Sequence, residues 1–82
     1  METEIHYIDH KPSLKEAQKL VGGYVERIDL PDGRQMLVDE DGKTKGKPLN
    51  EKATELLNKN STEPFKQIIV GDVIVLDHDN IW

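Results

Sequence analysis

Residues 24–38 read YVERIDLPDGRQMLV, and the fold follows from this stretch. Two runs rich in apolar residues, 24–30 and 34–38, flank the sequence Pro31-Asp32-Gly33. Proline presets the backbone φ of a turn, and glycine supplies a positive φ at little steric cost. Two strand-like runs joined by such a turn predict an antiparallel β-hairpin.

A strand and a helix are predicted before the hairpin. Apolar side chains alternate over residues 4–8, which indicates a short first strand. Residues 13–16 read SLKE, a capping box in which the Ser13 hydroxyl accepts from the Glu16 amide and the Glu16 carboxylate reaches back. The helix that begins there has one apolar face and ends at Gly22-Gly23, because glycine adopts the left-handed conformation easily.

A turn, a loop and a second helix are predicted after the hairpin. The acidic sequence of residues 39–42 ends in glycine and is typical of a turn, and residues 43–48 form an exposed loop. Asn50 is a suitable N-cap for a helix that runs to about residue 59, with an apolar face. The next residues, 58–64, are polar and rich in turn formers.

The last apolar block, residues 65–76, is rich in β-branched side chains and predicts a buried central strand. Gly71-Asp72 interrupts the block. Either residues 68–70 lead into a strand at residues 73–76, or the two halves kink at a bulge.

Together these elements predict one small α+β domain over residues 1–82, with a core at about 4–77 and a tail at 77–82. The order is β-α-β-β-α-β, with a mainly antiparallel sheet and two short helices packed on it. Ferredoxin-like folds share this order. The large apolar side chain of Trp82 lies in an otherwise polar tail, which together with a thin core favours a homo-oligomer.

Composition narrows the function classes. The chain has 82 residues and no cysteine, which excludes thiol catalysis, iron–sulfur clusters and cysteine zinc sites. A formal net charge of -5 makes direct nucleic-acid binding unexpected. Without cysteines, a basic signal sequence or a membrane-length apolar run, the chain is expected in the cytoplasm, which is the host cytoplasm if a phage encodes it.

The best candidate ligand site involves the lysine loop. Lys43, Lys45 and Lys47 alternate with small residues, so an extended loop would point them to one side. They lead to the helix N-terminus at Asn50, where free amides favour anions. Tyr24, beside the glycine pair, could stack on a ligand. These five residues predict a site for a small anionic ligand, with a solvated loop as the alternative.

No other cluster predicts catalysis, a metal or a cofactor. His10 and His78 could meet beside Asp77 or Asp79 if the first and last strands pair, although histidines at strand ends are usually surface residues. The acidic residues before Gly42 lack the further ligands of a calcium loop and are typical of a turn. No nucleophile has a base at a suitable spacing, so we expect a protein that is not an enzyme.

Three segments resemble a family of small proteins of unknown function from bacteria, plasmids and bacteriophages. They are the VGGY segment at residues 21–24, the DEDGK…GKPLN segment at residues 39–50, and IIVGDVIV at residues 68–75. The resemblance covers roughly residues 14–76. It departs from the family at Asp72 and in the first strand. It implies a setting among mobile elements and phage accessory genes, and it brings no catalytic residues.

These observations lead to two hypotheses. The first is a non-enzymatic accessory binding protein of a phage or mobile element, which counters host defence by blocking a host protein or by sequestering a small anionic nucleotide. The alternative is an acidic DNA mimic or another regulator of a nucleic-acid enzyme.

Overall fold

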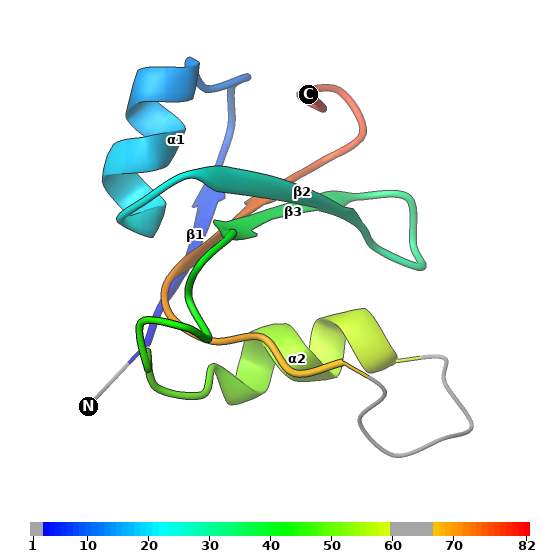
Figure 1. Ribbon diagram of the computed structural model, residues 1–82. Coiled ribbons are helices and arrows are strands. Elements are labelled where there is room, and N and C mark those ends of the chain that lie inside the picture. The colour runs from blue at the N-terminus through cyan, green and yellow to red at the C-terminus, as the bar shows by residue number, and fades with distance from the viewer. Residues whose placement is uncertain (1–2, 60–66) are drawn as a thin grey trace.

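Four strands and two helices follow one another in the order β-α-β-β-α-β in the computed structural model, which describes residues 3–59 and 67–82 (Figure 1). The elements are β1 (Ile5–Ile8), α1 (Leu14–Val21), β2 (Val25–Asp29), β3 (Gln35–Asp39), α2 (Glu51–Asn58) and β4 (Val73–Leu76). The predicted α+β order and the hairpin of β2 and β3 are confirmed. Most of the polar segment predicted at 58–64, and the start of the last apolar block, lie outside the described residues.

The strands form one sheet in the order β1-β4-β3-β2. The β2–β3 and β3–β4 pairs are antiparallel, whereas the β1–β4 pair is parallel. The sheet is therefore mainly antiparallel, as predicted. It is not arranged as in a ferredoxin-like split βαβ unit, because two strands, β4 and β3, lie between β1 and β2.

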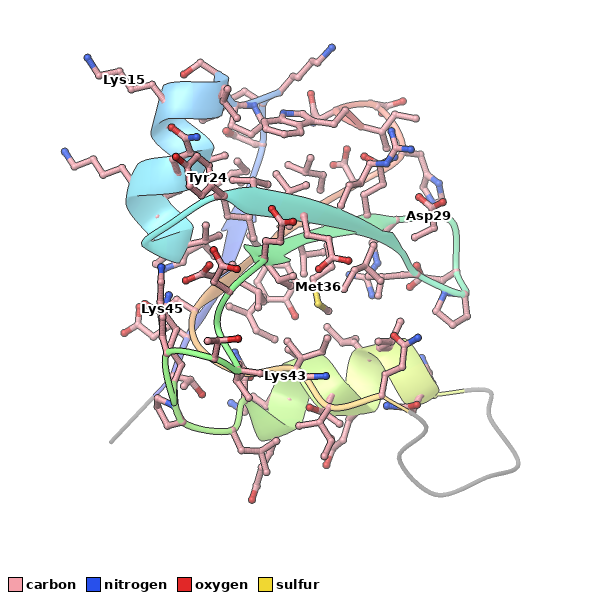
Figure 2. All side chains as sticks on the ribbon, in the orientation of Figure 1. Lys15, Tyr24, Asp29, Met36, Lys43 and Lys45 are labelled. Carbon is pink, nitrogen blue, oxygen red and sulfur yellow. The ribbon has the colours of Figure 1, made fainter. Side chains whose placement is uncertain are left out.

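The two central strands are buried on both faces of the sheet. Every residue of β3 and β4 is buried. Alternate side chains contact different helices. Those that pack with α2 are Met36, Val38, Val73 and Val75, and those that pack with α1 are Leu37, Ile74 and Leu76. One helix thus covers each face, and Figure 2 shows Met36 pointing from the sheet toward α2.

The ends of α1 follow the sequence prediction with one difference. The Ser13 hydroxyl accepts from the Glu16 amide at 3.1 Å, and the helix ends at Gly22 with φ 82°. The Glu16 carboxylate lies 3.0 Å from His10 Nε2 instead of reaching back to Ser13. Hydrogen bonds with Glu16 and then Asp9 raise the pKa of His10 above its ordinary value.

Asn50 is a buried N-cap that joins three parts of the chain. Its Oδ1 accepts from the Ala53 amide at 3.1 Å, and its Nδ2 donates to Gly71 O at 2.9 Å and to Glu4 O at 3.3 Å. Gly71 lies in a bend with φ 74° just before β4. Of the two alternatives for Gly71-Asp72, a lead-in segment followed by a strand at 73–76 is therefore the one observed.

The tail is docked on the sheet rather than loose. The Trp82 side chain packs with the α1-side core, and its indole N–H donates to Pro12 O at 2.9 Å. The Trp82 amide also donates to the Gln35 side-chain oxygen at 2.7 Å. Trp82 is therefore not a loose apolar group, because its ring packs against the core of its own chain, and self-association stays a prediction.

We predict that Asn50→Ala lowers the free energy of unfolding by about 2–4 kcal/mol, because it removes a helix cap and leaves the Gly71 carbonyl without its buried donor. Urea unfolding followed by circular dichroism measures this change. Ser13→Ala is the matched control, since Ser13 is an exposed N-cap with one bond to Glu16, and it should cost only about 1 kcal/mol. Equal losses of unfolding free energy in the two variants would contradict a role for Asn50 beyond that of a helix cap.

Candidate functional site

The lysine loop is compact rather than extended. Residues 40–46 form consecutive turns, in which the Lys45 amide donates to Asp41 O at 2.9 Å and the Lys47 amide donates to Gly42 O at 3.1 Å. The lysines therefore do not share one direction, and Figure 2 shows Lys43 and Lys45 leaving the loop differently. The expectation of a one-sided lysine row is wrong, because the turns rotate successive side chains.

Two of the loop lysines converge on a carboxylate. The Asp39 side chain is fully buried, and its Oδ2 lies 2.9 Å from Lys45 Nζ and 2.6 Å from Lys47 Nζ. The same ammonium groups donate to the last carbonyls of α1, Lys45 to Gly22 O at 3.2 Å and Lys47 to Val21 O at 2.6 Å. Cations are favourable at this negative end of a helix dipole.

The second glycine of the pair leaves room for this ion cluster. A Cβ atom at Gly23 would lie 2.6 Å from Lys45 Nζ and 2.8 Å from an Asp39 carboxylate oxygen. Real Cβ atoms do not approach other atoms so closely, so a larger residue would displace the ion pair. The VGGY segment is thus shaped by the cluster of Asp39, Lys45 and Lys47, in addition to ending the helix.

The cluster controls the ionisation of Asp39. Burial alone would raise the pKa of this carboxyl group. Hydrogen bonds from Lys47 and Lys45, followed by the one from the Asp41 amide, outweigh burial and lower the pKa to about 2. Asp39 is therefore a charged structural group, and its bond to the Asp41 amide is the turn chemistry that the sequence indicated.

The five predicted ligand residues do not form one site. Asn50 uses its amide inside the fold, and Lys45 and Lys47 are held by Asp39 and by α1. Tyr24 and Lys43 are exposed, with 68% of Tyr24 accessible. Only these two residues therefore keep their side chains at the surface without a structural partner among those recorded for the described residues.

A surface hollow that the sequence did not reveal lies on the α2 side of the sheet. Its volume is about 330 Å³. We call it the β2 hollow. Its lining comes from β2 (Glu26, Ile28), the end of β3 and the following turn (Val38, Asp39, Glu40, Lys43), and residues 67–70 (Gln67, Ile68, Ile69, Val70).

The strand register explains the position of the β2 hollow. Glu26 pairs with Val38 and Ile28 pairs with Met36, so both β2 side chains lie on the α2 face. The sequence predicted a strand at β2 but not its neighbour in the hollow, because residues 67–70 lie some forty positions further along the chain.

His10 and His78 have different neighbours. His10 contacts Glu16 and Asp9, whereas the His78 ring lies beside Gly33 in the hairpin turn. The hypothesis that His10 and His78 share a site is therefore not supported. Within residues 3–59 and 67–82, no group of three or more histidine, aspartate or glutamate residues is placed to hold a metal ion.

The fold and these sites define a small α+β domain with an internal ion cluster and a shallow, partly apolar surface hollow. The chain belongs to the DUF3846 family, a domain of unknown function, whose family model matches residues 1–81. Neither the curated proteins nor the solved structures gave a match. Neither helix in the described part of the chain is long and apolar enough to cross a membrane.

We predict that the Asp39 cluster stabilises the fold above pH 4. The folded pKa of about 2 lies below the ordinary 3.8, so this stability is present above pH 3.8 and is lost as the pH falls toward 2. The shift corresponds to about 2 kcal/mol. Asp39→Asn should cost about 3 kcal/mol at neutral pH, because it leaves two ammonium groups without their carboxylate.

Chemical unfolding at a series of pH values measures both effects. Asp32→Asn is the control, since Asp32 pairs with Arg34 at the surface and its loss should cost far less. A wild-type and an Asp39→Asn protein whose stabilities run parallel between pH 4 and 2 would contradict the assignment.

Proposed function

We propose that this protein is a non-enzymatic binding protein. A segment of another protein binds in its β2 hollow. The observation that carries the proposal is a hollow whose lining combines apolar side chains with exposed carboxylates. The partner chemistry that fits is an apolar side chain flanked by basic residues. The chain's net charge of -5 would favour such a partner at long range.

The apolar part of the lining is suited to one apolar side chain of a partner. Ile28 and Ile68 are only partly covered, and 48% of Ile68 is accessible. A volume of about 330 Å³ is at the small end of the range for ligand sites, which suits one anchoring side chain better than a large cofactor. Anchors of this kind supply most of the free energy in many protein interfaces.

The rim adds a preference for positive charge. Glu26 and Glu40 are exposed carboxylates on the lining, and Lys43 is the one cation there among the described residues. Asp39 also lines the hollow, but its charge is neutralised by Lys45 and Lys47. The remaining rim charges leave a small acidic excess, which supports electrostatic complementarity with a basic segment.

The other mechanisms receive less support from the geometry. Nucleotide sequestration was predicted on three lysines, and two of them, Lys45 and Lys47, contact Asp39 and α1 instead. A DNA mimic needs a regular array of free carboxylates, whereas Asp39, Asp32 and Glu16 are each paired with a basic group.

The biological setting of the proposal comes from the family resemblance alone. If the protein is an accessory product of a phage or mobile element, its partner is a host protein in the host cytoplasm. Blocking that partner would counter host defence. The acidic hollow supports binding to a basic surface, including that of a nucleic-acid enzyme, without requiring the protein to imitate DNA.

We predict that a displayed library of random peptides, panned on the protein, enriches sequences with an apolar residue between Lys or Arg residues. Amide chemical-shift changes caused by a selected peptide should centre on residues 26–28 and 67–70. The double variant Glu26→Lys with Glu40→Lys should weaken the peptide about tenfold or more, because it reverses the rim charge.

Glu55→Lys with Asp79→Lys is the charge-matched control, because it makes the same total change of charge at two exposed residues outside the lining of the hollow, and it should leave affinity within about twofold. Enrichment of acidic peptides, or shifts confined to the α1 face, would count against the proposal. So would tighter binding of a nucleotide panel than of any peptide.

A further inference from the structure

No strand among residues 3–59 and 67–82 pairs with the outer edge of β1. The strand lies at the end of the sheet, and its recorded backbone pairing is with β4 on one side. The opposite edge strand, β2, carries charged side chains at Glu26, Arg27 and Asp29. Charged residues are a common protection of edge strands, whereas β1 reads IHYI and has no such residue apart from a histidine.

The register fixes which backbone groups of β1 face outward. The Val73 amide donates to Glu4 O at 3.1 Å, and Ile5 is aligned with Val73 in the parallel pair. In a parallel ladder, alternate residues of each strand bond to the same neighbour. Residues 4, 6 and 8 therefore bond toward β4. The N–H and C=O groups of Ile5 and Tyr7 point away from the sheet.

The side chains of these two residues share the α2 face. Ile5 is aligned with Val73 and Tyr7 with Val75, and both valines pack on the α2 side. Tyr7 is 64% accessible although it lies within a strand. Next to it is a recess of about 750 Å³, lined by Ile5, Tyr7, Lys52 and the half-exposed Leu49 among others. We call it the β1 recess.

We propose that β1 pairs antiparallel with β1 of a second copy of this chain, around a two-fold axis that passes beside His6. Ile5 of each copy then lies opposite Tyr7 of the other. The outward N–H and C=O groups of both residues form four hydrogen bonds across the axis. The two four-stranded sheets become one continuous sheet with both α2 helices on the same face.

This register is selected by the structure. A two-fold axis perpendicular to the sheet keeps each side chain on its own face, so directly opposed residues must come from the same face. That condition excludes pairing Ile5 with Ile8. Centring the axis on Tyr7 would place Ile5 opposite Asp9, beyond the end of the strand, and would halve the hydrogen bonds made within β1.

The side chains support a second copy as the occupant. Opposed aromatic and β-branched residues form a favourable cross-strand pair, here Ile5 with Tyr7 of the other copy. The incoming ring lies over Ile5 at the β1 recess, where it can cover the exposed part of Leu49. Each copy thus supplies both the aromatic ring and the recess that receives it, as a two-fold interface requires.

Sedimentation equilibrium tests the proposal on the whole chain. We expect a monomer–dimer equilibrium that strengthens with salt, because each copy carries a net charge of -5. Tyr7→Lys should raise the dimer dissociation constant about tenfold or more while the circular dichroism spectrum stays unchanged, since the side chain is exposed. Tyr24→Lys is the matched control, because Tyr24 is equally exposed and lies at the opposite edge.

A monomer at millimolar concentration and high salt, or equal weakening by both tyrosine variants, would overturn the proposal. These outcomes leave the β2 hollow untouched, because Tyr7 and Tyr24 do not line it.

Disulfide crosslinking of single-cysteine variants tests the register, since the chain has no cysteine of its own. His6 faces its own counterpart across the axis in a non-hydrogen-bonded pair, where the Cα atoms are about 4.5 Å apart and a disulfide can form. His6→Cys should therefore give a covalent dimer on mild oxidation. Tyr7→Cys should not give a covalent dimer, because position 7 lies opposite position 5 of the other copy and the two cysteines would be two residues out of register. Crosslinking of Tyr7→Cys alone would overturn the register.

Discussion

The contact between Lys47 and Asp39 holds the parts of this small domain together. The Lys47 ammonium group lies 2.6 Å from the Asp39 carboxylate and 2.6 Å from Val21 O, so it joins the end of β3 to the end of α1. Its aliphatic stem passes Gly71, where a Cβ atom would lie 2.7 Å from Lys47 Cδ. One side chain therefore fixes the distance between α1, the central strands and the segment that enters β4. The three segments that resemble the family meet at this residue.

An ion pair at this position follows from how the sheet is covered. With β3 and β4 buried on both faces, a charged residue at the last position of β3 has to bring its own partners. Removing one member of such a pair strongly lowers the free energy of unfolding, because the remaining charge stays buried without a partner. Replacing the whole pair with apolar residues changes that free energy much less. The cluster thus makes the loop conformation and the sheet interdependent, even if its net contribution to stability is modest.

The local elements could be predicted from the sequence because their causes are local. The turn at Pro31-Asp32-Gly33, the Ser13 cap and the Asn50 cap depend on residues within a few positions. Lys45 and Lys47 were misread because alternation in a sequence gives a direction only in an extended chain, and this loop turns. The β2 hollow and the docking of Trp82 depend on strand order, since they join segments about forty to seventy positions apart, and no periodicity reports such distances.

The sequence motifs of this chain supply its ion cluster and its buried helix cap, so we expect partner binding at other residues. Residues that a fold needs for its ion cluster and buried cap have little freedom to recognise a partner, because changing them lowers the stability of the domain. Recognition can vary more freely at positions whose side chains the fold does not use, such as Glu26 and Ile68 at the hollow or Tyr7 at the open edge. Two short helices can cover the two central strands of the sheet but not its edge strands, β1 and β2. We therefore propose these margins of the sheet as the places where the chain meets other molecules, a partner segment at the β2 hollow and a second copy beside β1.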